Sequence, residues 1–324
     1  MKATLLKLFV GLALIALLLR AGLLDLGVLI GALRRPLPLL AAVAVLFGTL
    51  LVAAVRWQVL LRVQGILLPS GSTLRVVLAA AFFSTFLPGA LGGDLLRSGY
   101  MLRAARGRAS TGLLSIVTDR MLGLAGLLAV SALVALAHPR DIPRPLALAL
   151  GALVCALALL HYALPPITRA LARRVPPAAR SWRAALAHSA RELNTALATY
   201  HGARGTLAVG LALSMLICLL DIAGLLLVMR AMGIDALPWM QQALACSLAL
   251  IANNLPLSPG GLGIGEAAFA NVAIALEPRW TGAPYATAFL AYRCITVIST
   301  LPGAFVGVAP GARREAQSGR QQVR

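Results

Sequence analysis

The chain has 324 residues, of which 60% are hydrophobic and only 12% are charged, and its mean hydropathy is +0.88. This composition excludes a soluble globular domain and predicts an all-α, polytopic integral membrane protein. The formal net charge is +19, but nearly all basic residues lie at the ends of apolar segments, where they orient spans. We therefore expect membrane lipid, and no nucleic acid, as the partner of this charge.

The hydropathy pattern predicts eight helical elements, if each of two interrupted helices counts as one. In chain order they cover about residues 3–20, 37–61, the broken pair 73–86 and 91–105, 111–137, 146–164, 205–230, the broken pair 238–254 and 263–277, and 283–308. The first apolar run follows Lys2 and Lys7 but has no clean cleavage site. We expect it to be a retained span and not a removed signal peptide.

A glycine-rich turn interrupts both broken pairs. Each copy is followed within three residues by a carboxylate, Asp94 or Glu266, and a lone arginine, Arg120 or Arg293, lies in a later apolar segment. Gly/Pro-interrupted segments at corresponding positions of two halves are typical of a transport site. The residues predicted to form the turns are Pro88, Gly89, Gly92, Gly93, Pro259, Gly260, Gly261 and Gly263.

The distribution of basic residues predicts how the broken pairs lie in the membrane. If both are re-entrant, the chain crosses six times with both termini in the cytoplasm. Twenty basic residues, Arg56 and Arg97 among them, then lie inside and seven outside, as the positive-inside rule requires. If both pairs crossed, the arginine-rich loop 165–204 and the basic C-terminus would fall on opposite sides.

With re-entrant pairs, the two hairpins enter from opposite sides, so the repeat is inverted. The match also extends backwards, because Leu61–Ile66 resembles Met229–Ile234. Chance similarity between glycine-rich membrane turns is the alternative. The predicted division is a first repeat over 1–164 with hairpin 73–105, a cytoplasmic basic amphipathic connector over 165–204, a second repeat over 205–310 with hairpin 238–277, and a basic polar tail over 311–324.

Arg120 and Arg293 lie well inside apolar segments. A charge near the bilayer centre costs roughly 2.5–3.5 kcal/mol, so these side chains should face a partner or a cavity. Asp119 points about 100° away from Arg120 on a helix and is not its face-on partner. We predict that the two arginines meet Asp94, Glu266 or hairpin carbonyls. They serve either as structural ion pairs alone or as part of a path for an anionic head group.

The remaining polar candidates surround the turns. Amides exposed at the start of each second half-helix favour an anion, although Asp94 or Glu266 can instead cap the helix. The short polar residues before the turns either bond freed carbonyls or line the path; they are Ser84, Thr85, Asn253 and Asn254. With these, Asp119 completes the predicted substrate path. Asp221 stands alone in its span and is the candidate for coupled protonation.

The sequence carries no sign of a catalytic or metal centre. The four cysteines and four histidines are scattered, so no metal site, disulfide framework or cofactor is predicted. No nucleophile motif is present either, so we do not expect an enzyme.

Two motifs resemble the lysylphosphatidylglycerol synthase transmembrane-region family. The first is Phe83–Gly89 with Gly93–Arg97 and Thr118–Arg120, and the second is Asn254–Gly263 with Glu266 and Tyr292-Arg293. The resemblance spans nearly the whole chain, and the second motif is the more specific.

This family includes the flippase portion of the multiple peptide resistance factor proteins. The resemblance therefore implies a multi-pass protein of the inner membrane that is associated with lipid translocation. Those factors continue into more spans and a soluble aminoacyl-transferase domain, whereas this chain ends at Arg324. We therefore do not expect it to charge a lipid with lysine.

Stand-alone members are associated with hopanoid, isoprenoid-linked glycan or phospholipid pathways, so the resemblance does not name the lipid. The leading hypothesis is a lipid flippase or transporter for a polar, anionic head group. The alternative is a non-transporting membrane subunit that presents a lipid to a lipid-modifying or glycan-pathway enzyme.

Overall fold

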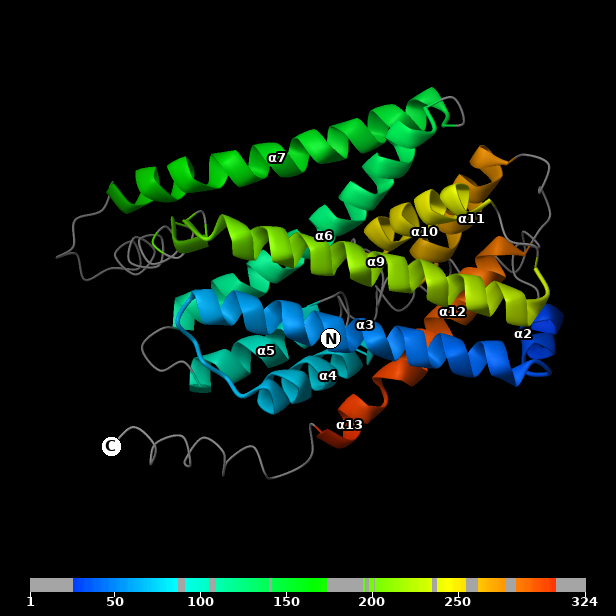
Figure 1. Ribbon diagram of the computed structural model, residues 1–324, viewed down its shortest axis with the longest axis horizontal. Helices are drawn as coiled ribbons and strands as arrows, with labels where there is room; N and C mark the ends of the chain where they lie inside the picture. The colour runs from blue at the N-terminus through cyan, green and yellow to red at the C-terminus, as the bar shows by residue number, and fades with distance from the viewer. Residues whose placement is uncertain are drawn as a thin grey trace, which may run out of the picture.

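A computed structural model describes residues 26–86, 91–104, 109–139, 142–173, 195, 198–200, 202–234, 238–254, 262–277 and 284–306. Within these ranges every regular element is a helix (Figure 1). In chain order the helices are α2 (Leu26–Ala32), α3 (Pro36–Val63), α4 (Ser70–Phe86), α5 (Leu91–Ala104), α6 (Ala109–Ala137), α7 (Arg144–Arg173), α9 (Arg204–Met232), α10 (Trp239–Asn253), α11 (Ile264–Leu276), α12 (Tyr285–Thr300) and α13 (Pro302–Val306). The predicted helix 3–20, most of the connector and the tail lie outside the described residues.

Four helical segments are long and apolar enough to cross a membrane. They are Pro36–Val63, Thr111–Ala137, Arg204–Met232 and Tyr285–Val306, and each corresponds to a predicted span. Residues 146–164 lie in α7, of which Arg144–Ala156 is a further apolar stretch. The all-α membrane class is therefore confirmed, while the count of six crossings stays a prediction.

Two helix ends depart from the predicted ones. Helix α7 continues through Pro165 and Pro166 to Arg173, although each proline removes a backbone donor. The expected helix over 283–308 ends at Thr300, and the short α13 starts at Pro302. Because Pro302 cannot donate the next helical hydrogen bond, it is a physical cause of this break.

Helices α3 and α9 form the centre of the bundle. They pack along their length, and Figure 1 shows them side by side with opposite chain directions. Helices α6 and α12 likewise run in opposite directions in that view. Opposite directions for corresponding helices are what an inverted repeat predicts.

The ends of α3 and α9 have the same local structure. Gly65 has φ +71° and Gly233 has φ +69°, a left-handed conformation that glycine adopts without a steric cost. The following amides close the same pattern, because Ile66 N donates to Leu61 O and Ile234 N donates to Met229 O, each at 3.0 Å. The sequence match between these two segments therefore reflects a shared helix-ending motif.

Corresponding helices of the two halves make corresponding contacts across the boundary between the halves. Helix α3 packs against α12, and its counterpart α9 packs against α6. The first helix of each hairpin also packs on the last long helix of the other half, α4 against α12 and α13, and α10 against α6. Neither half is thus a separate domain, since each completes its core with helices of the other.

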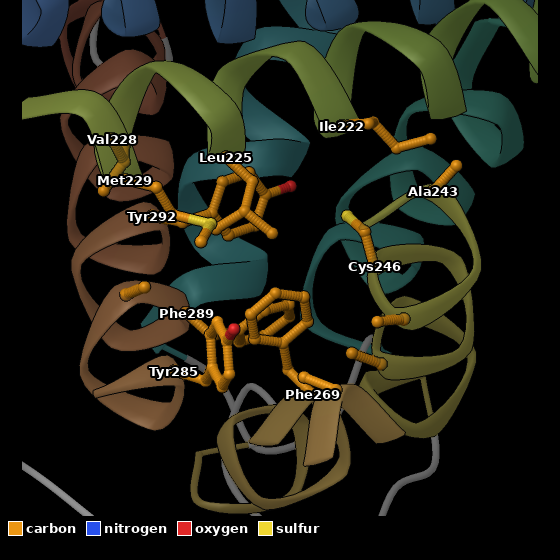
Figure 2. Close-up of a cluster of buried hydrophobic side chains, with 14 of the residues drawn as sticks. Ile222, Leu225, Val228, Met229, Ala243, Cys246, Phe269, Tyr285, Phe289 and Tyr292 are labelled. Atoms are coloured by element: carbon orange, nitrogen blue, oxygen red, sulfur yellow. The ribbon is translucent and has the colours of Figure 1, made fainter. Parts of the chain in front are cut away.

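The largest buried cluster lies in the second half, between α9, α10, α11 and α12. Figure 2 shows the rings of Phe269, Tyr285, Phe289 and Tyr292 gathered there. Phe269 stacks on Phe289 with ring centroids 5.5 Å apart, and Phe289 contacts Tyr292 at 5.4 Å. Aromatic pairs of this geometry contribute beyond the area they bury, so these rings help to hold the second hairpin to α12.

Candidate functional site

The first hairpin contacts α6 through an accessible ion pair. Asp94 lies in the first turn of α5, and Arg120 lies in the middle of α6. Arg120 Nε donates to the two Asp94 carboxylate oxygens at 2.9 and 3.3 Å, and Nη2 donates to Oδ1 at 3.1 Å. Such a forked arrangement fixes the direction of the guanidinium. The predicted contact between Arg120 and Asp94 is confirmed.

The second hairpin contacts α12 through a corresponding pair. Arg293 Nη1 donates to Glu266 Oε1 at 2.9 Å, and Nη2 donates to Asn253 Oδ1 at 2.6 Å. The other Glu266 oxygen accepts the Gly263 amide at 2.8 Å, which caps the start of α11. One carboxylate thus fills both roles considered for Glu266, helix capping and contact with the arginine.

The residues before each turn also have matching positions. Ser84 Oγ accepts the Gly93 amide at 3.0 Å, which ties the end of α4 to the start of α5. Asn253 ties the end of α10 to Arg293. Asn254 donates to Leu250 O of its own helix at 2.8 Å, so it bonds a freed carbonyl. Thr85 lies in the last turn of α4.

Most of the predicted turn residues cannot be placed. Pro88, Gly89, Pro259, Gly260 and Gly261 lie outside the described residues. The remaining three belong to the second helices of the hairpins: Gly92 and Gly93 lie in the first turn of α5, and Gly263 directly precedes α11.

The two ion pairs differ in accessibility. The Arg120 and Asp94 side chains are 41% and 21% exposed, whereas those of Arg293 and Glu266 are 13% and 1% exposed. An exposed pair exchanges partners at little cost, whereas a sealed pair exchanges only if the surrounding helices move. In this structure the first half therefore presents its arginine and the second half covers its own.

A second group of charges, almost fully buried, lies beside the accessible pair. Asp119 Oδ1 accepts Arg56 Nε at 2.7 Å, and Oδ2 accepts Arg97 Nη1 at 2.9 Å. Arg56 Nη1 also donates to Ser214 Oγ at 2.7 Å. The three charged side chains are between 4% and 9% exposed. This group, called the Asp119 cluster below, joins α3, α5, α6 and α9.

The Asp119 cluster has one more positive than negative charge. The Arg97 guanidinium lies over the Trp57 ring at 4.9 Å, where the ring face attracts a cation. Trp57 Nε1 in turn donates to Ser115 Oγ of α6 at 3.2 Å. Among the described residues, the buried Arg97 Nε has no hydrogen-bond partner. The ring contact is thus the only interaction seen for that part of the guanidinium among those residues.

Arg56 and Arg97, which the charge count assigns to cytoplasmic segments, have side chains that are buried in the protein. The physical reason is Asp119, whose charge needs a cation once Arg120 points elsewhere. Two signals were available: Arg97 follows Asp94 by three residues and shares its helix face, and Arg56 lies almost two turns inside its helix. Removing both from the inside count leaves eighteen basic residues against seven, so the predicted orientation is unchanged.

In the second half, Tyr292 occupies the position of Asp119, directly before the arginine. Tyr292 Oη donates to Asp221 Oδ1 on α9 at 3.0 Å. This is the one hydrogen bond seen for the Asp221 carboxylate within the described residues. Asp221 is partly buried near the middle of α9, where an unpaired carboxylate is costly. The geometry agrees with a residue that binds a proton, but no contact joins Asp221 to either arginine.

The described residues contain no group of three or more histidine, cysteine, aspartate or glutamate side chains that could hold a metal ion. The site seen here consists of arginines, carboxylates and small polar groups. Such a set can bind and release an anion by exchanging arginine partners.

The comparisons with known proteins give one match. The family model described as "Lysylphosphatidylglycerol synthase TM region" matches residues 4–307, a range that includes both hairpins and all four apolar spans. This agrees with the resemblance of the two turn motifs. A search of the curated proteins and a search of the solved structures each find no match.

Proposed function

The chain belongs to the lysylphosphatidylglycerol synthase transmembrane-region family, and from this premise we propose that it is a lipid flippase or transporter. The family and the apolar helices indicate a membrane protein with a lipid-related function. In the proposed mechanism, a lipid with a polar, anionic head group passes through a midplane cavity between the inverted halves. Its tails remain in the bilayer.

The observation that carries this proposal is the accessible pair of Arg120 and Asp94. Because the Arg120 side chain is 41% exposed, an incoming phosphate or carboxylate can replace Asp94 as its partner. The released Asp94 carboxylate lies in the first turn of α5, where the helix dipole stabilises a negative charge. Arg293 provides an equivalent contact once α12 and the second hairpin separate.

A second candidate function rests on the sealed state of the other pair. Arg293 is held by both Glu266 and Asn253 and is 13% exposed. If this pair never opens, a lipid reaches Arg120 from one side only. The protein would then be a membrane subunit that holds a lipid for a partner enzyme, such as a lipid-modifying or glycan-pathway enzyme.

Lipid translocation in proteoliposomes distinguishes the two candidates. Fluorescent analogues of an anionic and a zwitterionic phospholipid are placed in both leaflets, and an impermeant quencher reports the fraction that changes leaflet. We expect translocation with the wild type and its loss in the Arg120→Ala/Arg293→Ala double variant. Arg103→Ala, which removes an exposed arginine of α5 away from the site, should behave as the wild type.

Equal translocation by the wild type and the double variant would overturn the proposed role of the arginines. No translocation by the wild type with any probe lipid would favour the lipid-holding subunit. A further arm applies a pH gradient to the wild type and to Asp221→Asn, which keeps an oxygen that accepts from Tyr292. If Asp221 couples transport to protons, the gradient should accelerate the wild type and leave the variant unchanged.

A further inference from the structure

The facing sides of α5 and α6 form two ionic contacts of opposite polarity. Asp94 of α5 pairs with Arg120 of α6, and one turn further along α5, Arg97 pairs with Asp119. Asp94 and Arg97 share one face of α5 because they are three residues apart. Asp119 and Arg120 are adjacent in α6, so their side chains leave that helix in directions about 100° apart.

This crossed arrangement specifies how α6 is rotated against α5. A rotation of α6 that brought Asp119 towards Asp94 would turn Arg120 by the same angle, away from both Asp94 and Arg97, because the two side chains move together. Both ion pairs would then be broken, and the two aspartates would repel each other. Only one rotation of α6 satisfies both contacts, and it is the one that directs Arg120 to the accessible position.

The rotation is also fixed from the opposite side by α3 and α9. Arg56 of α3 reaches Asp119 at 2.7 Å and Ser214 of α9 at 2.7 Å. Gly123 of α6 lies beside this guanidinium, and an added Cβ there would lie 3.5 Å from Arg56 Nη1, an ordinary contact distance. Asp119 is thus held by two helices while its neighbour Arg120 stays accessible.

The second half has residues at the corresponding positions, but their side chains are aromatic where those of the first half are charged. Phe269 follows Glu266 by three residues, as Arg97 follows Asp94, and Tyr292 precedes Arg293, as Asp119 precedes Arg120. Phe269 and Tyr292 are joined through the ring of Phe289 (Figure 2). The Tyr292 hydroxyl then reaches Asp221 on α9 at 3.0 Å, and α9 is the counterpart of α3.

We propose that Asp119 and Tyr292 are positioning residues for the two arginines. Each ties an arginine-bearing helix, α6 or α12, to the first long helix of its own half. In doing so it sets the direction in which the following residue, Arg120 or Arg293, points towards its hairpin. The inference rests on the proposed function only in that these arginines are taken to meet the head group.

The test uses two pairs of cysteines, one in each half, in a variant without the native cysteines. The first pair replaces Asp94 and Arg120, the second replaces Glu266 and Arg293, and a short thiol cross-linker reports whether the members of a pair face each other. Asp119→Asn should abolish cross-linking of the first pair and leave the second unchanged. Tyr292→Phe, which removes one oxygen atom, should do the reverse.

Each pair is the internal control for the other, because a variant that fails to fold would lose both. Unchanged cross-linking of the first pair in Asp119→Asn and of the second in Tyr292→Phe would overturn the proposal. So would loss of both pairs in Tyr292→Phe, since that residue would then support the whole fold and not its own half. Cross-linking needs no transported lipid, so this result is independent of the proposed function.

A second measurement addresses function directly. If Asp119 acts through Arg120, the translocation rate of Asp119→Asn/Arg120→Ala should equal that of Arg120→Ala alone. If Asp119 has only a structural role, the two losses should multiply. Multiplied losses would overturn the positioning role even if cross-linking were altered.

Discussion

Asp94 and Asp119 are both paired with arginine, but the Asp119 side chain is the more deeply buried of the two. The Asp94 side chain is 21% exposed and has one arginine partner, whereas that of Asp119 is 4% exposed and has two. Removing one member of a buried pair leaves an uncompensated charge behind, whereas the partner left by an exposed pair can turn towards other polar groups. The two aspartates should therefore contribute very differently to stability.

We expect Asp119→Ala to reduce the free energy of unfolding by about 3–5 kcal/mol, because Arg56 and Arg97 would both lose their carboxylate. The matched variant Asp94→Ala should cost less, because the Arg120 side chain is 41% exposed and can turn towards another polar group. Denaturant unfolding of the purified protein in detergent measures both. Equal losses of unfolding free energy in the two variants would contradict the expectation that the more buried aspartate contributes more to stability.

At the residue scale, sequence reasoning succeeded where a charge inside an apolar segment required a partner. The cost of Arg120 and Arg293 in an apolar segment required acceptors, and the repeat supplied Asp94 and Glu266 at matching offsets. It failed for Arg56 and Arg97, because basic residues near helix ends are usually solvated and were counted as such. Their burial follows from a contact between α3, α5 and α6, and the two local signals at Arg56 and Arg97 do not identify the partner.

At the scale of elements, the hairpin α4–α5 depends on a close approach of two helices. An added Cβ at Gly93 would collide with Ser84 Oγ and with the backbone carbonyl of Ala80. Gly99 lies on the same helix, and nothing lies within 4 Å of a Cβ added there. Alanine substitutions at these two glycines of α5 can therefore distinguish the effect of helix packing from the effect of helix propensity.

We expect Gly93→Ala to push α4 and α5 apart and to lower both the melting temperature in detergent and the translocation rate. Gly99→Ala should leave translocation unchanged and raise stability slightly, since alanine is favoured over glycine in a helix by about 1 kcal/mol. Thermal unfolding of the two variants, measured alongside the wild type, provides the comparison. If Gly93→Ala lowered neither the melting temperature nor the translocation rate, the close approach of α4 and α5 at Gly93 would not be needed for stability or transport.

Helix positions were largely predictable because long apolar segments with glycine and proline at their ends leave few alternatives. The helix ends that differ from the predicted ones lie at prolines. Pro302 divides the last predicted span, and the adjacent Pro165 and Pro166 fail to end α7. Proline removes a donor wherever it stands, but whether the helix stops depends on the packing around it.

At the scale of the whole molecule, the opposite directions of α3 and α9 support the inverted topology predicted from charge. Arg34 precedes α3 and Arg62 lies at its end, while Arg204 begins α9 and Arg230 lies near its end; all four are exposed. The topology places Arg34 and Arg230 outside and Arg62 and Arg204 inside. These four positions therefore test the orientation of both central helices.

We expect single cysteines at positions 34 and 230 to react with an impermeant maleimide in intact cells. Cysteines at positions 62 and 204 should react only after the membrane is permeabilised. Both predictions follow from the excess of basic residues on the inside. Labelling of positions 34 and 204 from the same side would contradict opposite directions for the two helices in the membrane.

The unequal exposure of Arg120 and Arg293 gives the molecule a functional polarity. In the predicted topology, in which the hairpins enter from opposite faces, we expect the open arginine to face one leaflet and the covered arginine the other. A preparation with mixed insertion would present Arg120 to both leaflets and conceal any preferred direction of lipid movement. Vesicles in which every copy is inserted the same way are therefore needed to decide which leaflet is the donor and which the acceptor.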